Sequence, residues 1–379
     1  MTYDFDKIIE RRNTGNVKWD RFKGRDIIPM WVADMDFQSP PEVMAAMHRY
    51  VDHGVFGYPL PTDEQVATVC NFLKTKYGWK IKSSWLVWLP GLVPALNLAC
   101  RTYCEPGEAV IMTTPIYPPF LMAPKFSKRE MITVPLDFAE GCWRVNLERL
   151  KEAVSPETRL LLLCNPYNPV GRVLPADEVR AIADFCRERE IVLCSDEIHC
   201  ELILDDLTHT PTAMLGPDIA DITVTLMAPS KTFNLPGLCL AYAVISNGRL
   251  RQKFKAEMRG ITPEINSIGV VACQAAYEHG EPWRLALLDY LRKNRNFVQE
   301  FVNQELPGIS VQHVEATYLA FLDVRNTGLE DPNAFFEAAG VGLSDGRLFG
   351  TDGFQRLNFG CPRATLEEGL RRMKNALDG

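Results

Sequence analysis

The sequence has no apolar run long enough to cross a bilayer, for which about 20 consecutive apolar residues are needed. Its first stretch, Met1 to Asp20, is rich in charge and lacks the apolar core that a secretory signal peptide carries. Although the chain has 11 cysteines, it contains no Cys-x-x-Cys pair, and no pair of histidines at metal-site spacing accompanies Cys100 and Cys104, which are one helical turn apart. We therefore expect free thiols, no metal site, no membrane span and a cytoplasmic location.

Positive charge is also scarce, because 41 lysines and arginines face 48 aspartates and glutamates and the net charge is -7. Nucleic-acid-binding proteins need clustered positive charge, so this balance argues against a nucleic-acid partner and favours a small polar substrate. The apolar content of 46% and the charged content of 23% are those of an ordinary globular protein. At 379 residues the chain exceeds the size at which one core keeps growing, so two domains are expected.

Continuous apolar segments predict buried strands at residues 160–164, 191–194 and 222–227, and a helical pattern at 176–189 connects the first two. Apolar strands joined by helices predict a mainly parallel sheet covered on both faces, which is a doubly wound α/β fold. Beyond Gly269 the pattern changes to helices followed by short strands, which predicts a second, smaller α+β domain. The predicted division is a large domain at 48–280 and a small domain that combines 1–47 with 281–379.

Two further predictions concern local structure near the N-terminus. Residues 1–28 predict a charged helix followed by a polar linker. Thr62 and Gln65 predict a capping box at the start of a helix that runs through Tyr77.

Polar motifs follow several of the predicted strands, and in open parallel sheets ligands bind at these strand ends. The motifs are Asn165 to Gly171, Asp196 to His199 and Ser230-Lys231, so we expect them to converge on one crevice. Lys231 follows an apolar strand, where desolvation lowers the pKa of a lysine toward the neutral amine that attacks carbonyls. A lysine in a loop is more often simply exposed, so its interpretation depends on the other motifs.

Four motifs in this order resemble a known family, the pyridoxal-phosphate (PLP) enzymes of fold type I in the class I/II aminotransferase group. They are Asn165-Pro-Tyr-Asn-Pro-Val-Gly171, Ser195-Asp-Glu-Ile-His199, Ser230-Lys-Thr-Phe-Asn-Leu-Pro-Gly237 and Arg356-Leu-Asn-Phe-Gly-Cys-Pro362. Trp31-Val-Ala-Asp-Met-Asp-Phe37 narrows the resemblance to the MalY/PatB subgroup of carbon–sulfur β-lyases. The resemblance extends from about Trp31 to the end of the chain.

The resemblance implies that Lys231 holds pyridoxal 5'-phosphate as a Schiff base and, once freed by substrate, moves the Cα proton. It implies that Asp196 pairs with the pyridine nitrogen, that Asn168 and His199 bind the 3-oxygen, and that Tyr117 stacks on the ring. Each residue also has a simpler explanation: an aspartate can cap a helix, a histidine can be structural, and an asparagine or tyrosine can belong to a loop.

The resemblance also implies a phosphate site where the turn Pro90-Gly91 leads into a helix, because N–H groups at a helix start bind anions. The expected donors are the backbone N–H groups of Leu92 and Val93, the Ser230 hydroxyl, and Tyr58 from the neighbouring subunit.

Two positions depart from the pattern of many aminotransferases, which carry Ser or Thr at position 228 and Arg at position 239. This chain has Ala228 and Cys239 there, so other donors must neutralise the phosphate. MalY-type relatives are similar in lacking the arginine.

On the substrate side, the resemblance assigns the α-carboxylate to Arg356, whose planar guanidinium suits a bidentate contact. Asn168 and Ala33 are the further substrate contacts that the resemblance implies, and Tyr58 joins Lys231 as a catalytic residue.

The function predicted first is therefore a PLP-dependent β-lyase that cleaves cystathionine or cysteine conjugates to thiol, pyruvate and ammonia. An aminotransferase is the alternative, since it shares the early chemistry and nothing in the motif spacing separates the two. A PLP-bearing regulatory protein of MalY type is a third hypothesis. Because Tyr58 is read as completing the neighbour's site, a homodimer with shared active sites is expected.

Overall fold

A computed structural model describes residues 3–139 and 141–379, and all element bounds below refer to that part of the chain. The larger sheet has the strand order β2-β10-β9-β8-β7-β3-β4, and β10 is antiparallel to both of its neighbours whereas the strands from β9 to β4 are parallel. The strands are β2 (Leu86–Leu89), β3 (Ala109–Thr114), β4 (Glu130–Pro135), β7 (Thr158–Cys164), β8 (Val192–Asp196), β9 (Thr223–Met227) and β10 (Ala241–Val244).

The order in which the chain adds strands to this sheet reverses between β3 and β7. From β3 the chain moves to β4 at one edge, whereas from β7 it moves through β8 to β9 toward the other edge. Right-handed crossovers then place the connecting helices on opposite faces, and they leave a crevice between the carboxyl ends of β3 and β7. Both β3 and β9 are buried at every position, as expected for strands covered on both faces.

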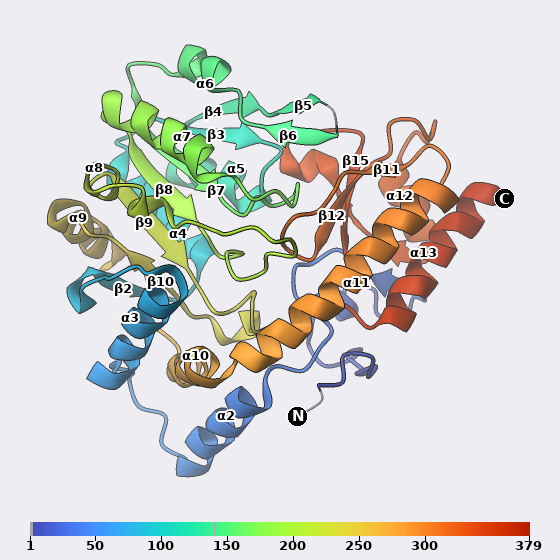
Figure 1. Cartoon of the computed structure of the whole chain (residues 1–379), viewed down its shortest axis with the longest axis horizontal. Helices are drawn as coiled ribbons and strands as arrows, with labels where there is room; N and C mark the ends of the chain where they lie inside the picture. Colours follow the sequence, from blue (N-terminus) through green and yellow to red (C-terminus); the bar gives the residue numbers. More distant parts are fainter. Residues whose placement is uncertain (1–2, 140) are drawn as a thin grey trace.

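Helices cover both faces of the sheet (Figure 1). α4 contacts most of the parallel strands and packs beside α5 and α9, while α7 contacts β8 and packs beside α6 and α8. α10 packs against α2 and α3. Their bounds are α2 (Pro41–His53), α3 (Asp63–Tyr77), α4 (Leu92–Tyr103), α5 (Pro118–Ser127), α6 (Leu147–Ala153), α7 (Ala176–Glu188), α8 (Pro217–Ala220), α9 (Gly248–Met258) and α10 (Ser267–His279), with the 3-10 turns η1 (Ser83–Trp85), η2 (Thr212–Met214) and η3 (Pro236–Leu238).

A smaller antiparallel sheet, with the order β11-β12-β15-β14, lies in the C-terminal part. The long helix α11 runs from beside α10 to this sheet and packs against α13 (Figure 1). The elements of the C-terminal part are α11 (Glu281–Glu305), β11 (Ser310–Val311), β12 (Leu319–Asp323), α12 (Pro332–Ala338), β13 (Val341–Gly342), β14 (Ser344–Asp345), η4 (Gly346–Phe349), β15 (Phe354–Asn358) and α13 (Arg363–Asp378). The remaining elements of the chain are α1 (Val17–Asp20), β1 (Ile28–Pro29) and the antiparallel pair β5 (Asp137–Ala139) and β6 (Cys142–Arg144).

The N-terminal residues join the C-terminal region through a separate two-stranded sheet. β1 pairs in parallel with β13, and Phe5, Ile28 and Met30 belong to the same apolar core as β12 and α13. A separate core lies around the larger sheet. The predicted α/β fold with a second, smaller α+β region is confirmed. The division into 48–280 and 1–47 with 281–379 stays a prediction, and its first two residues lie outside the described part.

Local predictions succeeded where one capping interaction decides the structure. The capping box is present, since the Thr62 hydroxyl accepts from the Gln65 N–H and the Gln65 side chain accepts from the Thr62 N–H.

All 11 cysteines are free. In the described residues, no helix is both long and apolar enough to span a membrane.

The predicted charged helix within residues 1–28 is wrong, because the described part of this segment contains only the short helix α1. Asn13 and Gly15 have positive φ, and the Asp20 carboxylate accepts their N–H groups at 2.6 and 2.8 Å. Such local side-chain contacts offer the backbone an alternative to the helix. Helix α5 was not predicted, since its prolines resemble a loop, although Pro118 stands at a first-turn position where no N–H is needed.

Gly171, which ends the Asn-Pro-Tyr-Asn-Pro motif, illustrates how the larger sheet meets the C-terminal region. Its φ is +71°, and a Cβ there would lie 2.7 Å from the Val314 side chain and 3.3 Å from the Ala316 carbonyl oxygen. The Gly171 carbonyl accepts the N–H groups of Glu315 and Ala316 at 2.9 Å each.

We predict that Gly171→Ala lowers the free energy of unfolding by about 1–3 kcal/mol, because the added methyl group is both strained and overpacked. The midpoint of urea unfolding measures this loss. The control is Gly248→Ala at the start of α9, where the nearest atom is 3.7 Å from the added Cβ. Equal midpoints for the two variants would contradict the prediction.

Candidate active site

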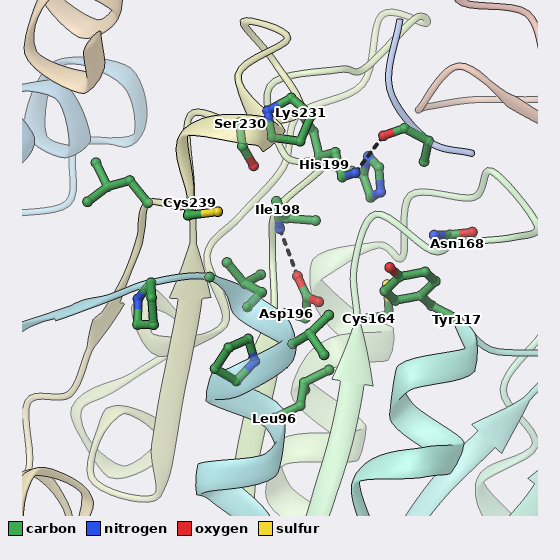
Figure 2. Close-up of a pocket in the computed structure, with 18 residues that line it drawn as sticks. Leu96, Tyr117, Cys164, Asn168, Asp196, Ile198, His199, Ser230, Lys231 and Cys239 are labelled. Carbon is green, nitrogen blue, oxygen red and sulfur yellow. Dashed lines mark hydrogen bonds between the residues drawn. The ribbon is translucent and has the colours of Figure 1, made fainter. Parts of the chain in front are cut away.

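A cavity of about 190 Å³ lies at the carboxyl ends of the parallel strands. Figure 2 shows Tyr117 and Asn168 on one side of Asp196 and Cys239 on the other. The walls of the cavity come from several segments that follow strands, which agrees with the prediction that the polar motifs at the strand ends converge on one crevice. The lining residues are Ala33, Pro90, Gly91, Leu92, Val93, Pro94, Leu96, Tyr117, Cys164, Asn168, Asp196, Ile198, His199, Ser230, Lys231, Pro236, Cys239 and Leu240.

Lys231 enters the cavity from the turn after β9, whose five residues are all buried. Its amine donates a hydrogen bond to the Ala33 carbonyl oxygen at 2.5 Å (Figure 2). Burial lowers the pKa of the Lys231 amine to about 8, although the Asp34 carboxylate acts in the opposite direction. About one tenth of the amine is therefore neutral at pH 7, far more than for an exposed lysine, and the neutral form is the one that attacks a carbonyl.

Asp196 is the last residue of β8, and one of its oxygens accepts the Ile198 N–H at 3.1 Å (Figure 2). Burial raises the pKa of Asp196 to about 7. The Ile198 N–H and the Lys231 charge act against this rise, and the neighbouring Glu197 charge adds to it. A buried carboxylate without an ion-pair partner among the described residues suits a ligand that presents a charged N–H group.

The strand end that carries Asp196 is held from behind by the buried side chain of Glu197. One Glu197 oxygen accepts from the Ser195 hydroxyl and the Thr212 N–H, both at 2.9 Å. Its other oxygen lies 2.8 Å from Nε2 of His209, which is also buried. Three buried hydrogen bonds to Glu197 therefore hold the residue that follows Asp196 at the end of β8.

His199 lies within the same wall, and its Nδ1 atom is buried without a hydrogen-bond partner in the described chain. Burial lowers the pKa of His199 to about 3, and the charges of Lys231 and Arg356 contribute to the same shift. The ring is therefore neutral. A neutral imidazole that points an unsatisfied nitrogen into a buried site is suited to bind a polar ligand atom.

Arg356 lies in β15 of the smaller sheet and is not one of the residues that line the cavity. Its guanidinium donates to the Asn168 side-chain oxygen at 3.0 Å and to the Trp31 carbonyl oxygen at 2.6 Å, and it lies over the Phe349 ring at 4.7 Å. The Nε atom of Arg356 is buried and has no partner within residues 3–139 and 141–379. Burial lowers the pKa of Arg356 to about 10, so it remains a cation that can bind a carboxylate.

The start of α4 forms another wall. Gly91 precedes the helix, and Leu92 and Val93 are its first residues, whose N–H groups have no partner within the helix. Ser230 lies opposite in the same cavity. Free N–H groups at the positive end of a helix, together with a hydroxyl, suit an anion such as a phosphate.

Tyr117 follows β3 and begins α5, so it stands at the point where the direction of the sheet reverses. Burial raises the pKa of Tyr117, so its phenol is protonated near neutral pH and can donate a hydrogen bond. Its ring borders the space above Asp196 in Figure 2.

Most of the residues predicted from the sequence thus lie together. Arg356 contacts the site through Asn168 rather than lining the cavity. Tyr58 lies apart, with 97% of its surface exposed, and it lines no part of the cavity in its own chain. The residues that line the cavity are Ala33, Leu92, Val93, Tyr117, Asn168, Asp196, His199, Ser230 and Lys231.

Two side chains of the site had not been predicted, the buried Tyr318 and the half-buried Asn234. Tyr318 donates from its hydroxyl to the Ala33 carbonyl at 2.9 Å, beside the amine of Lys231. Asn234 donates to the carbonyls of Met35 and Phe37, and its oxygen accepts the Met35 N–H. The sequence could have indicated Asn234, because it lies in the motif that contains Lys231. No sequence pattern could have indicated Tyr318, because its acceptor is a backbone carbonyl that is distant in sequence.

Comparison with known proteins agrees with this geometry. The model of the family "Aminotransferase class I and II" matches residues 25–373. The "Cystathionine beta-lyase PatB" of Bacillus subtilis is 38% identical, over 99% of this chain and 100% of its own length. Among solved structures, that of OvoB is 41% identical with a TM-score of 0.96, and it covers 99% of both chains. Cystalysin from Treponema denticola, whose crystal structure contains pyridoxal 5'-phosphate, is 34% identical with a TM-score of 0.96, over 100% of this chain and 99% of its own.

The chain therefore belongs to the class I and II aminotransferase family. Within that family it is similar to the proteins PatB and MalY, as its motifs predicted, and the predicted resemblance is confirmed.

We predict that Lys231 reacts with aldehydes as an amine with a pKa of about 8, because burial removes the solvation of its charged form. The measurement is the rate at which the cofactor-free chain forms a Schiff base with pyridoxal 5'-phosphate at different pH values, trapped by borohydride and located by peptide mass analysis. The rate should rise through pH 8 and level off above it. A midpoint near that of an exposed lysine would contradict the prediction, and Lys231→Ala is the control that identifies the site.

Proposed function

We propose that this chain is a PLP-dependent carbon–sulfur β-lyase that cleaves cystathionine or a related cysteine conjugate to a thiol, pyruvate and ammonia. The observation that carries the proposal is one cavity that combines a partly neutral lysine with a buried carboxylate, next to an arginine that contacts the cavity residue Asn168 and whose Nε has no partner in the described chain. Family membership and the cystathionine β-lyase name of PatB support the choice of reaction. The predicted cofactor is borne out by the family and by its PLP-bound members.

The residues of the cavity fit this cofactor. Asp196 provides a carboxylate for the ring nitrogen, and the unsatisfied Nδ1 of His199 and the amide of Asn168 provide contacts for a ring oxygen. Tyr117 provides an aromatic face, and the start of α4 with Ser230 provides donors for the phosphate. When bound, the cofactor supplies an aldehyde carbon for amines and a ring that withdraws electrons from the substrate Cα.

In the proposed reaction Arg356 binds the substrate α-carboxylate through its guanidinium, using the Nε that lacks a partner in the described chain. Asp196 keeps a proton on the ring nitrogen, because a carboxylate beside it favours the charged ring. The neutral amine of Lys231 takes the proton from the substrate Cα. The bond between Cβ and sulfur then breaks, the thiolate leaves, and water completes the release of pyruvate and ammonia.

An aminotransferase is the second candidate, since the matching family model bears that name. Both reactions need the same amine, carboxylate and arginine, and they differ only in where the proton held by Lys231 goes next. The cytoplasmic location expected from the sequence stays a prediction.

We predict that the purified holoenzyme releases pyruvate and thiol from cystathionine in equal amounts without any added keto acid. Lys231→Ala should lower kcat by at least about 10²-fold, because the group that moves the Cα proton is lost. Coupled lactate dehydrogenase and thiol assays measure the two products. Amino transfer that depends on a keto acid, with negligible pyruvate from cystathionine, would reject the lyase in favour of the aminotransferase.

We also propose that the protein is a homodimer in which Tyr58 completes the site of the partner. The segment after α2 exposes several large side chains besides Tyr58, namely Val55, Phe56 and Leu60. A contiguous set of exposed apolar side chains indicates an interaction surface. The proposed phosphate site also has no arginine at position 239, so a tyrosine hydroxyl from a second subunit would add a donor there.

Hybrid dimers test this arrangement. If Tyr58 crosses the interface, a dimer of one Lys231→Ala chain and one Tyr58→Ala chain has one intact site and should keep about half of the activity of the unmodified dimer. Two differently tagged chains are co-expressed and the hybrid is purified through both tags. The control is a hybrid of Lys231→Ala and Asp196→Asn, in which both sites are damaged. Equally low activity in the two hybrids would contradict the shared site.

A further inference from the structure

A buried group of charges lies beside the site, formed by two cations from the N-terminal segment and two carboxylates from the segment Trp31 to Phe37. Arg11 donates to both Asp34 and Asp36, the latter at 2.5 Å, and Lys18 donates to Asp36 at 2.8 Å. Lys18 is 1% exposed and Asp36 is 5% exposed. Burial opposes the ionisation of Asp36, but Lys18 and Arg11 outweigh it and hold the pKa of that carboxyl below its usual value.

The same cations also bind the backbone of the segment. Arg11 donates to the Met35 carbonyl at 3.0 Å, and Lys18 donates to the Asp34 carbonyl at 3.1 Å. The Trp31 indole returns a hydrogen bond to the Lys18 carbonyl at 3.0 Å. Side chains and backbone of the two segments are therefore linked at several points, so neither can shift without breaking buried hydrogen bonds.

At its other end this segment holds two cations of the site. The Ala33 carbonyl accepts the amine of Lys231 at 2.5 Å, and the Trp31 carbonyl accepts the guanidinium of Arg356 at 2.6 Å. Asn358 donates to the Val32 and Asp34 carbonyls between and beside them. One short stretch of backbone therefore connects the buried charges to both groups that the proposed reaction uses.

Asp34 also acts on Lys231 by its charge. Oδ1 of Asp34 is buried and has no hydrogen-bond partner in the described part of the chain, while Oδ2 binds Arg11. Among the charged groups that affect Lys231, the largest contribution comes from Asp34, followed by Arg356 and Asp196, and Lys231 in turn faces the ring of His199. The Asp34 carboxylate favours the protonated amine against the effect of burial.

We propose that Arg11 and Asp34 are positioning residues for Lys231: Arg11 fixes the segment Trp31 to Phe37, so that the Ala33 carbonyl orients the free amine, and the adjacent Asp34 places a buried carboxylate oxygen without a hydrogen-bond partner in the described chain next to that carbonyl. This inference rests on the proposed role of Lys231. A group of charges that only anchored the N-terminus would stabilise the fold and leave the reactivity of Lys231 unchanged.

The test follows the reaction of the full-length, cofactor-free chain with pyridoxal 5'-phosphate over a range of pH. Its plateau rate at high pH reports how well the neutral amine is oriented, and its midpoint reports the pKa of Lys231. Asp34→Asn keeps the shape of the side chain and removes its charge, so the midpoint should fall by about half a unit to one unit. At pH 7 the Schiff base should then form about 2.5-fold to 5.5-fold faster relative to the plateau, because the neutral fraction of the amine rises from about one tenth to between one quarter and one half.

Arg11→Gln should lower the plateau rate by about tenfold, because the Ala33 carbonyl no longer holds the amine. Arg11→Lys, which keeps the charge but not the forked geometry, should recover part of that loss. The control is Lys23→Gln, which removes one positive charge from an exposed side chain of the same N-terminal region. Circular dichroism and thermal melts show which variants are folded at the temperature of the measurement.

The outcomes separate the two proposals. If the unmodified chain forms no Schiff base at Lys231, the proposed function fails. If the unmodified chain reacts as expected, but folded Asp34→Asn keeps its midpoint and folded Arg11→Gln keeps its plateau rate, only the positioning role is overturned. Should Arg11→Gln fail to fold, an unchanged midpoint in Asp34→Asn overturns the proposal by itself.

Discussion

The proposed reaction depends on keeping the amine of Lys231 out of water without surrounding it with enough negative charge to restore its proton. Burial at the end of β9 lowers the pKa of the amine to about 8. Asp196 and Asp34 oppose the effect, while Arg356 adds to it. A lysine that was fully exposed would be protonated, and one paired tightly with a carboxylate would be too. The cavity balances these influences, because the amine must be neutral to act as nucleophile and base.

That balance follows from the topology of the larger sheet. The reversal between β3 and β7 opens a crevice, and the parallel strands deliver Tyr117, Asn168, Asp196 and Lys231 to the same edge. Arg356 arrives from a different sheet, and its contact with Asn168 connects the two. The segment from Trp31 to Phe37 lies across both, so three parts of the chain that are far apart in sequence meet around one amine.

Much of the fold and site could be predicted because the relevant information is local. Apolar strands followed by polar motifs indicate a parallel sheet with residues at its carboxyl edge, and a threonine with a glutamine in the first turn indicates a helix start. The region around α1 could not be predicted in this way, since Asp20 captures backbone N–H groups that a helix would otherwise use. Helix α5 was missed for the opposite reason, because Pro118 and Pro119 resemble a loop but occupy first-turn positions that tolerate proline.

By itself the sequence determined which residue types stand at the strand ends, and therefore the chemistry available to the site: a lysine, an aspartate, a histidine and an asparagine that follow buried strands. Only the tertiary structure decided what surrounds them. Tyr318, Arg11 and Lys18 act on the site through the backbone carbonyls and carboxylates of the segment Trp31 to Phe37. A side chain that binds a distant backbone group leaves no spacing pattern in the sequence, because its position depends on how the chain folds around the acceptor.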